Sequence, residues 1–573
     1  MDHQKEYLRW CEKAVADVDI VEELKRLKEK DNEIQDAFFR HLTFGTGGLR
    51  GIIGAGTNRM NIYTVAMASQ GLANYIIKNF PENKRRIAIG YDSRIKSKTF
   101  SQTAASVFSA NGIKVFIYRQ LMPTPCLSFA VRYLDCSAGV MITASHNPST
   151  YNGYKVYDKN GCQITSKTTA DISAKIAQLD IFEDIKRTDF SEALERGMIE
   201  YIKDTVCEAF LEEIKKQSVL FGEEVNKALT MIYSPLNGTG LVPVTRILSE
   251  MGYVHLITVK EQEHPDGQFP TCPYPNPEVR DTMLLGIEYA RKFNAGLLIA
   301  TDPDCDRVGI GVRDHAGEYL LLSGNETGIL LFDYICDQRK KHNRMPSDPI
   351  MIKSIVTTKL AEKIADNYGV KTINVLTGFK YIGEQICFLE ERDQREQYIF
   401  GFEESYGYLS GSYVRDKDGV GAALLICEMF SYYATQGKSL LDKLNELYKR
   451  YGYYLDVMHS YIFEGASGIR KMQSVMGFFR GDITSIGGMS IKRCLDYSDG
   501  LYGLPRANVL KFELENNCSV ILRPSGTEPK IKIYISVSGV DSERARIMEN
   551  NIRRDIRRMM QLFKEVVPEP KPL

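Results

Sequence analysis

The spacing of apolar residues predicts helices over the first forty residues and alternating strands and helices after Gly45. Spacings of three and four residues, which place side chains on one face of a helix, relate Leu8, Cys11 and Val15, and then Val21, Leu24 and Leu27. Farther along, short apolar runs predict strands over 87–90, 113–118 and 139–143, with a helix over 100–111. Strands that alternate with helices favour an α/β fold with a mostly parallel sheet.

The same alternation returns twice, which we interpret as a degenerate internal repeat. The second copy predicts strands over 229–233, 254–259 and 297–300 and a helix around 244–251. The third copy predicts strands over 350–356, 372–376 and 398–400 and a helix around 360–368. The sequence therefore predicts three related α/β units.

The end of the chain follows a different order. Strands are predicted over 509–514, 520–522 and 531–537, and an amphipathic helix comes after them, with an apolar face of Ile552, Ile556, Met559 and Phe563. This order predicts an α+β domain. The opposite face of the helix is rich in arginine, and we interpret it as a solvated surface because the whole chain is electrically neutral.

Composition and charge exclude several classes of protein. The 573 residues include 73 basic and 73 acidic side chains, so the formal net charge is zero. A hydrophobic fraction of 43% excludes a disordered chain, and zero net charge argues against a nucleic-acid partner, which a basic surface attracts. No apolar run approaches the roughly 20 residues that span a bilayer, so we expect no membrane partner.

The cysteines and the N-terminus predict a cytoplasmic protein. None of the twelve cysteines forms a C-x-x-C pair, so neither a zinc cage nor a thioredoxin-like site is expected. We interpret them as reduced thiols, mostly in the core. The first six residues, Met-Asp-His-Gln-Lys-Glu, are polar and predict no signal peptide.

The first segment with candidate chemistry, Thr143-Ala-Ser-His-Asn-Pro148, follows a predicted strand. In open α/β sheets ligands bind at the carboxyl ends of strands, so several such segments can share one cleft. Ser145 is a candidate nucleophile, although the G-x-S-x-G elbow of serine hydrolases is absent. Serine, asparagine and proline are also common turn residues, so a plain strand-ending turn stays open. Lys155 is near enough in sequence to reach the same site.

The second segment, Asp302-Pro-Asp-Cys-Asp-Arg307, follows the apolar run over 296–300. Three carboxylates at alternate positions suit a hard divalent cation, which prefers oxygen ligands. An EF-hand is excluded because Arg307 and Arg313 stand where that loop needs glycine and glutamate. Without a metal the carboxylates would repel one another, and a solvated acidic loop is the alternative.

Two more segments offer polar groups after strands. Gly401-Phe-Glu-Glu-Ser-Tyr-Gly407 presents acceptors and a hydroxyl suited to sugar hydroxyls, and an ordinary turn explains it equally well. Arg523-Pro-Ser-Gly-Thr-Glu-Pro-Lys530 combines a cation, two hydroxyls and a glycine turn, which favours a phosphate nest. It is not a Walker loop, since G-x-x-x-x-G-K-[ST] does not occur. A plain turn would explain the proline and glycine but not the arginine and the hydroxyls together.

In this order the segments resemble those of the α-D-phosphohexomutase superfamily, over nearly the whole chain after about residue 40. Segment 143–148 is similar to that family's phosphoserine loop, 302–307 to its metal loop, 401–407 to its sugar-binding loop in the E-E-S form, and 523–527 to its phosphate-binding loop. Segment 45–51 resembles the family's G-T-S-G-L-R motif with Gly47 in place of serine, and 377–380 resembles another sugar-contacting loop. The likeness is greatest to the branch that holds phosphoglucomutase-2-type and phosphopentomutase enzymes.

The resemblance implies an α/β molecule of four domains around a central cleft. Three related α/β domains, 1–212, 213–323 and 324–452, would come before a C-terminal α+β domain, 453–573. The implied reaction is the reversible conversion of glucose 1-phosphate and glucose 6-phosphate, with Mg²⁺ as cofactor and glucose 1,6-bisphosphate as activator and intermediate. The expected partners are small sugar phosphates, and the chain is expected to be a monomer or a weak homodimer.

The resemblance also assigns roles to individual residues. Ser145 would carry the phosphoryl group and, with Asp302, Asp304 and Asp306, hold the metal. Arg50, Lys155 and His146 are the other catalytic candidates. Lys155 matches the family's lysine proposed for acid–base work and would need a lowered pKa to act as a base at neutral pH. His146 adjoins the nucleophile, where a structural role is favoured over a catalytic one. The candidate substrate ligands are Thr377, Gly378, Glu403, Ser405, Lys417, Arg307, Arg523, Ser525, Gly526, Thr527 and Lys532, the last of which stands where relatives often have arginine.

Rival functions stay open at this point. A phosphopentomutase or a glucose-1,6-bisphosphate synthase would use the same chemistry on another substrate. A non-catalytic sugar-phosphate sensor would need no nucleophile, so Ser145 and the three aspartates argue against it.

Overall fold

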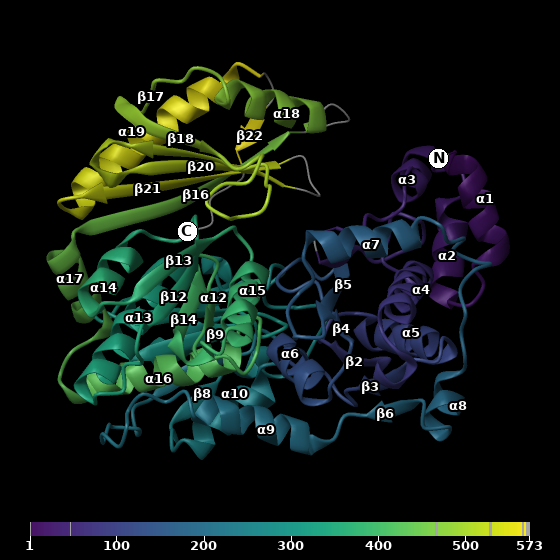
Figure 1. The fold of residues 1–573 in the computed structure, drawn as a ribbon, viewed down its shortest axis with the longest axis horizontal. Coiled ribbons are helices and arrows are strands. Elements are labelled where there is room, and N and C mark those ends of the chain that lie inside the picture. Colours follow the sequence, from purple (N-terminus) through teal and green to yellow (C-terminus); the bar gives the residue numbers. More distant parts are fainter. Residues whose placement is uncertain (1, 46, 464–467, 526–529, 564–565, 569–573) are drawn as a thin grey trace.

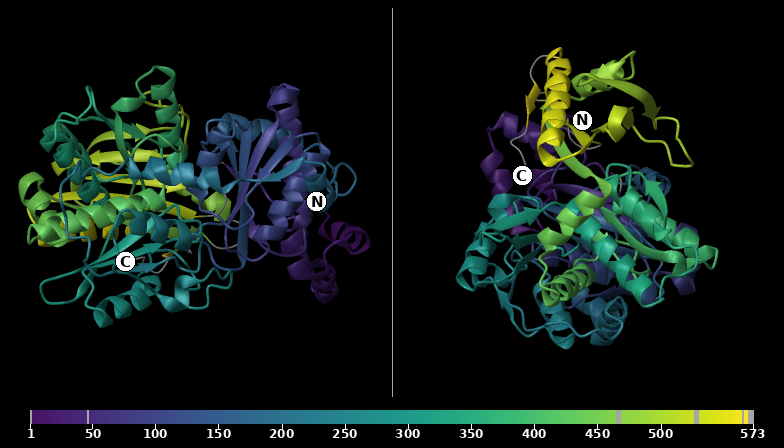
Figure 2. Two further views of the ribbon diagram at one scale, coloured as in Figure 1. Left: turned by 90° about the horizontal axis from the view of Figure 1, so that it is seen from below. Right: turned by 90° about the vertical axis from the view of Figure 1, so that its left-hand side faces the viewer.

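The computed structural model describes residues 2–45, 47–463, 468–525, 530–563 and 566–568. Four β-sheets of six, five, four and seven strands follow one another along this part of the chain. Figure 1 shows the first sheet and the N-terminal helices at one end of the molecule, with the second and third sheets at the other end and the fourth sheet above them. The right-hand view of Figure 2 again shows the fourth sheet standing above the rest.

Three helices come before the first sheet, as predicted: α1 (His3–Lys13), α2 (Val18–Leu27) and α3 (Asp31–Phe38). The predicted buried face of the first helix is wrong, because Leu8 and Val15 are 64% and 70% exposed. The buried positions are Tyr7, Trp10 and Ala14, which have the same spacing. The ring of Trp10 lies 5.3 Å from that of Tyr63, so the larger aromatic area decides which face turns inward.

The first sheet has the strand order β1-β5-β4-β2-β3-β6. Its strands are β1 (Gly48–Ile52), β2 (Arg86–Tyr91), β3 (Lys114–Ile117), β4 (Ala138–Ile142), β5 (Tyr151–Asp158) and β6 (Ile199–Tyr201). The helices of this part are α4 (Ile62–Asn79), α5 (Ser97–Ala110), α6 (Thr124–Tyr133), α7 (Ser166–Ile176), α8 (Phe190–Glu195) and α9 (Asp204–Lys215).

The second and third sheets have the orders β11-β10-β9-β7-β8 and β13-β12-β14-β15. The second unit contains β7 (Met231–Ser234), α10 (Leu241–Glu250), β8 (Leu256–Thr258), α11 (Lys260–Glu263), α12 (Arg280–Lys292), β9 (Leu297–Thr301), β10 (Val308–Arg313) and β11 (Tyr319–Leu322). The third contains α13 (Gly324–Lys341), β12 (Ile350–Ser354), α14 (Leu360–Tyr368), β13 (Lys371–Val375), α15 (Phe379–Glu391), β14 (Tyr398–Glu403), β15 (Gly407–Leu409), α16 (Gly419–Thr435) and α17 (Leu440–Tyr451).

The strand pairing confirms the internal repeat. In each unit a central strand (β2, β7 or β12) pairs in parallel with the next two strands of the chain. The fourth strand (β5, β10 or β15) then returns antiparallel to the third. The sheets are therefore parallel at the centre but not at this edge, because a connection of a few residues can join only antiparallel strands.

The fourth sheet is antiparallel throughout its described strands, in the order β17-β18-β19-β20-β21-β16-β22. Its elements are β16 (Tyr453–Phe463), α18 (Gly468–Phe479), β17 (Ser485–Ile486), β18 (Met489–Asp496), β19 (Leu510–Leu514), β20 (Ser519–Pro524), β21 (Lys530–Gly539), α19 (Ser542–Gln561) and β22 (Val566–Pro568). Ile552 and Ile556 of α19 are buried against this sheet, which agrees with the predicted α+β domain.

The fourth sheet has an apolar core of its own and meets the third unit through a small cluster that includes Ile355, Leu376, Ile521 and Tyr534. All twelve cysteines lie in the described part of the chain, nine of them buried and none in a disulfide, in agreement with the sequence interpretation. Among the described residues, no helix has both the length and the apolar character needed to cross a membrane.

Candidate active site

The four polar segments meet at one cleft, which has a volume of about 1520 Å³. In the three α/β units each segment lies in the hairpin between the third and fourth repeat strands, and the last segment joins β20 to β21. Repeated topology therefore brings together loops that are far apart in sequence. The predicted site residues that line the cleft are Arg50, Ser145, His146, Lys155, Asp306, Arg307, Thr377, Gly378, Glu403, Ser405, Lys417, Arg523 and Lys532.

Ser145 lies on the turn after β4 and is only 3% exposed. Its φ of +53° is left-handed, a conformation that non-glycine residues adopt at a cost. Its backbone N–H donates to Thr143 Oγ1 over 2.8 Å, and its Oγ donates to Asp302 Oδ2 over 2.8 Å. A plain turn does not account for a buried hydroxyl directed at a carboxylate of another unit.

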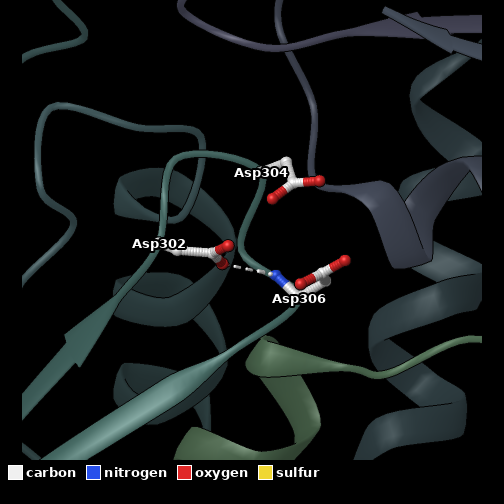
Figure 3. A group of neighbouring side chains, drawn as sticks. All are labelled: Asp302, Asp304 and Asp306. Carbon is white, nitrogen blue, oxygen red and sulfur yellow. Dashed lines mark hydrogen bonds between the residues drawn. The ribbon is translucent and has the colours of Figure 1, made fainter. Parts of the chain in front are cut away.

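Asp302, Asp304 and Asp306 project from the short loop between β9 and β10 (Figure 3). All three are buried, and one oxygen of each lies within 4.8 Å of an oxygen of the others. Asp302 Oδ1 accepts the backbone N–H groups of Asp306 (3.1 Å) and Arg307 (3.0 Å). Asp304 Oδ2 accepts the hydroxyl of Thr124 from the first unit (2.8 Å). The structure thus rejects a solvated acidic loop.

This group of carboxylates could hold a metal ion. Asp304 Oδ1 and Asp306 Oδ1 are buried without a hydrogen-bond partner among the described residues. Burial, together with the charges of Asp304 and Asp306, raises the pKa of Asp302 well above its ordinary value. A divalent cation would supply the missing partner for the buried oxygens and offset the crowded negative charge.

Two lysines lie against the same carboxylates. Lys155 Nζ is 2.7 Å from Asp304 Oδ2 and 3.3 Å from Asp306 Oδ2, and Lys417 Nζ is 3.0 Å from Asp306 Oδ2. Burial acts to lower the pKa of Lys155, but the two aspartates outweigh it and hold that pKa above its ordinary value. The pairing with acids that lie about 150 residues away in sequence therefore favours the protonated form of Lys155.

His146 and Arg50 also contact the Ser145 loop. His146 Nδ1 is 3.2 Å from Ser145 Oγ. Burial, with the nearby charges of Arg307 and Arg50, holds the pKa of His146 well below its usual value, so the imidazole is neutral. Arg50 donates to Asn147 Oδ1 over 2.9 Å, and Arg307 forms an ion pair with Glu278.

The third unit contributes Glu403, which is the last residue of β14 and not part of a loop as the sequence suggested. Its Oε1 accepts the backbone N–H of Gly378 over 2.6 Å, and Gly378 has a φ of +121° that favours glycine. Burial and the charge of Glu403 raise the pKa of Glu404 to about 7. Ser405 and Thr377 line the cleft beside them.

The fourth sheet supplies the basic end of the cleft. Arg523 on β20 is paired in register with Lys532 on β21, so both side chains lie on one face of the sheet. Burial and the charge of Arg523 lower the pKa of Lys532. Strand β20 extends to Pro524, two residues beyond its predicted end. Ser525 N–H donates to Lys530 O over 2.7 Å, and the predicted ligands Gly526 and Thr527 lie outside the described residues.

Sequence reasoning missed three residues that build this site. Arg94 donates to backbone carbonyls of the Ser145 loop, Thr124 binds Asp304, and Glu278 pairs with Arg307. None of the three belongs to a segment that stands out by composition, and each acts through a contact that only the fold creates.

Comparison with known proteins identifies the family. The model for the phosphoglucomutase/phosphomannomutase alpha/beta/alpha domain I matches residues 41–181, that for domain II matches 208–317, and that for domain III matches 323–451. The chain belongs to the phosphoglucomutase/phosphomannomutase family. A phosphoglucomutase from Staphylococcus saprophyticus is 38% identical over 518 residues, covering 88% of this chain and 92% of the relative.

Solved structures of phosphoglucomutase/phosphomannomutase-type proteins share the fold. Parafusin, a phosphoglucomutase from Paramecium, aligns in its open form with a TM-score of 0.70 and 17% identity, over 92% of this chain and 97% of that one. A phosphomannomutase-like protein from Thermus thermophilus gives a TM-score of 0.67 and 21% identity, over 90% and 99% of the two chains. These alignments extend the family architecture over most of the chain and so to the fourth sheet, which lies beyond the three matched ranges.

Proposed function

We propose that this chain is a phosphoglucomutase, which interconverts glucose 1-phosphate and glucose 6-phosphate. The observation that carries the proposal is the hydroxyl of Ser145, which donates to Asp302 within a buried group of three aspartates at the end of the cleft. Acceptors for sugar hydroxyls and a basic pair, Arg523 and Lys532, line the rest of that cleft. The name phosphoglucomutase of the S. saprophyticus relative supports the same activity.

In this reaction phosphorylated Ser145 transfers its phosphoryl group to O6 of glucose 1-phosphate. The bond from phosphorus to Oγ breaks, a bond from phosphorus to O6 forms, O6 loses its proton and Oγ gains one. The glucose 1,6-bisphosphate then turns over in the cleft. Its 1-phosphoryl group is then transferred to Ser145: the bond from phosphorus to O1 breaks, a bond from phosphorus to Oγ forms, Oγ loses its proton and O1 gains one, and glucose 6-phosphate leaves.

Asp302, Asp304 and Asp306, together with an oxygen on Ser145, are the residues that would hold Mg²⁺, which would neutralise the negative charge of the transferring phosphoryl group. All of these ligands are oxygens, and two of them, Asp304 Oδ1 and Asp306 Oδ1, are buried without a hydrogen-bond partner in the described part of the chain. Such a group fits a hard cation of this kind. Arg50 and Arg307 line the same end and would stabilise the phosphoryl oxygens.

We assign proton exchange at Ser145 Oγ to His146, whose neutral ring nitrogen is 3.2 Å away. Lys155 is paired with Asp304 and Asp306, which favour its protonated form, and we assign it the role of proton donor. This proposal gives His146 the base role that the resemblance implied for Lys155, because the partners of each side chain influence its protonation.

The remaining predicted residues would bind the substrate. Glu403 and Ser405, with Thr377, Gly378 and Lys417, would recognise the sugar hydroxyls. Arg523 and Lys532, with Ser525, Gly526 and Thr527, would hold the phosphate that is not reacting. Glucose 1,6-bisphosphate would serve as activator because it can phosphorylate Ser145.

We further propose domain boundaries at 1–212, 213–323, 324–452 and 453–573, which keep each sheet within one domain. The chain would act in the cytoplasm as a monomer or a weak homodimer, with sugar phosphates as its partners.

Incubation with glucose 1,6-bisphosphate and intact-mass measurement test the proposal. We expect one phosphoryl adduct that maps to Ser145, and turnover of glucose 1-phosphate. An unmodified serine and no turnover would reject the function.

Phosphopentomutase is the second candidate, because it would use the same serine and metal site. A pentose lacks part of the hydroxyl pattern offered to Glu403 and Ser405, and each unpaired buried polar group costs about 1–3 kcal/mol. We therefore expect a higher kcat/KM for glucose 1-phosphate than for mannose 1-phosphate or ribose 1-phosphate, with less preference in Glu403→Gln. Faster use of ribose 1-phosphate would change the substrate and leave the mechanism as it is.

A further inference from the structure

Arg94 lies behind the loop that carries Ser145 and is not among the residues that line the cleft. It follows β2, in the segment that leads to α5, and is 3% exposed. A buried guanidinium needs hydrogen bonds for its donors, so its partners indicate what the charge is there to hold.

The partners of Arg94 are backbone carbonyls of a single loop. Nη2 donates to the carbonyl of Ser145 over 2.6 Å and also to that of Asn147. Nη1 donates to the carbonyls of Pro148 over 2.8 Å and Tyr151 over 3.0 Å. One side chain therefore fixes the backbone of the nucleophile loop on both sides of its turn.

The charge of the guanidinium is balanced from the other direction. Nε lies 3.5 Å from Asp92 Oδ2, an ion-pair contact without a hydrogen bond. Asp92 is itself fixed, since its Oδ1 accepts the backbone N–H of Arg94 over 3.0 Å and the hydroxyl of Ser97 over 2.7 Å. Lysine could not replace this planar fork, because an ammonium group has three donors around one point.

The second unit packs against the same arginine. The guanidinium carbon lies 5.1 Å from the centre of the Phe269 ring. Nearby, Gly267 approaches so closely that a Cβ on it would lie 2.5 Å from the backbone nitrogen of Ile95. Residues 267–269 of the second unit thus close over the segment that positions Arg94.

The contacts of Arg94 stabilise the left-handed backbone of Ser145. A left-handed non-glycine residue persists only where its surroundings over-determine it, and Arg94 supplies contacts to the residue itself and to three of its loop neighbours. Ser145 also has to stay within reach of Asp302, which belongs to the second unit.

We propose that Arg94 is a positioning residue that holds the Ser145 loop in its reactive conformation, and that residues 267–269 of the second unit hold Arg94 in place. The Ser145 loop is thereby connected to the second unit at two places. One is within the cleft, through Asp302, and the other is behind it, through Arg94 and residues 267–269. The inference rests on the proposed function, since the reaction it serves is phosphoryl transfer at Ser145.

Arg94→Lys tests the proposal in the full-length protein with Mg²⁺. We expect kcat for glucose 1-phosphate to fall by about 10- to 100-fold, as a small misplacement of a reacting group does, while KM changes by less than about twofold because Arg94 does not line the cleft. Hydrogen exchange of the free protein gives a readout that is independent of activity. Amides of 144–152 should exchange about tenfold faster or more, with little change elsewhere.

Arg85→Lys is the matched control. Arg85 is a partly buried arginine directly before β2, and it also donates to backbone carbonyls, those of Phe80 (3.1 Å) and Ile77 (3.2 Å), away from Ser145. It should leave kcat and the exchange of 144–152 as they are in the wild type. Phe269→Leu removes the ring beneath the guanidinium and should change kcat and loop exchange in the same direction as Arg94→Lys, but less. It also tests the proposal if Arg94→Lys fails to fold.

Several outcomes would overturn the inference. Wild-type kcat and loop exchange in Arg94→Lys would show that the loop holds itself. Faster exchange spread evenly over the protein would show a general structural role. Wild-type values in Phe269→Leu would remove the second unit from the inference. A wild-type enzyme without mutase activity would instead reject the proposed function, and the exchange experiment would still decide whether Arg94 positions the loop.

Discussion

The two ends of the cleft differ in how deeply their polar residues are buried and how fully other residues of the protein hydrogen-bond to them. At the end formed by the first and second units, Ser145 and the three aspartates are almost fully buried and bonded to groups of both units. At the end formed by the third unit and the fourth sheet, Ser405, Arg523 and Lys532 are half-buried and face open space.

This difference agrees with two functions, phosphoryl transfer at the buried end and substrate binding at the open end. Groups that stabilise developing charge are most effective when they are fixed and dehydrated before the substrate arrives. Groups that must hold either phosphate of a sugar that turns over have to stay accessible. The comparison teaches that the same repeated hairpin can support a closed catalytic loop or an open binding loop, depending on whether a second unit packs against it.

The sharpest test of the closed end is Ser145→Ala. We expect kcat to fall by at least about 10⁴-fold, since removal of a covalent nucleophile leaves only binding and electrostatic effects. Steady-state turnover and thermal unfolding should be measured together. Ser101→Ala is the control, because it also removes a buried hydroxyl of the same unit, one that donates to Lys98 O. Near wild-type turnover in Ser145→Ala would disprove the covalent route.

Removal of divalent metal, followed by Asp304→Asn, tests the acidic group itself. Chelation should stop turnover and Mg²⁺ should restore it, while the substitution should lower kcat by on the order of 10²- to 10³-fold and weaken its dependence on Mg²⁺. Deleting one of three negative charges reduces the attraction for a cation. Turnover that survives exhaustive chelation would contradict the assignment of the aspartates as metal ligands.

At the open end, Arg523→Ala should raise KM for glucose 1-phosphate and for glucose 6-phosphate by about 10- to 150-fold, the value of a charged hydrogen bond, with a smaller effect on kcat. Both directions should be measured because one site has to hold either phosphate. Arg493→Ala is the control, since its ion pair with Glu513 is exposed on the same sheet. An effect confined to one direction would break the comparison between the two ends.

The smallest expected effect concerns stability at the open end. The pKa of Glu404, about 7, is above the ordinary value of 4.5, so between these values the folded state binds more protons than the unfolded state. Stability must therefore fall as the pH rises through this window, and Glu404→Gln should lessen the fall by about 1–3 kcal/mol. Denaturant unfolding at pH 5 and pH 8 measures it. An unchanged difference, equal to that of the exposed Glu396→Gln, would rule out the raised pKa.

Much of the architecture was predictable because local patterns repeat. Apolar runs predicted the three parallel strands at the centre of each α/β unit, and polar segments after strands predicted the loops that form the cleft. The antiparallel strands β5, β10 and β15 were not among the predicted strands.

The electrostatic state of the site was less predictable. The raised pKa of Lys155 depends on Asp304, which lies 149 residues away in sequence. Arg94 belongs to no conspicuous motif, since its role depends on carbonyl oxygens, which every residue carries. The prediction of the buried face of the first helix was wrong because two sets of apolar residues have the same helical spacing. Only tertiary packing decides which set is buried.

The dispersal of the cleft over four sheets has a consequence for biosynthesis. The nucleophile at Ser145 leaves the ribosome long before Asp302, and Arg523 comes later still, so at about 5–20 residues per second the chain spends on the order of 20–80 s with a serine but no complete cleft. A truncated or half-made molecule therefore has no means of moving phosphate between sugars. Activity begins only when the last sheet has folded over the third unit, so gain of turnover during translation would mark the moment at which the whole chain is finished.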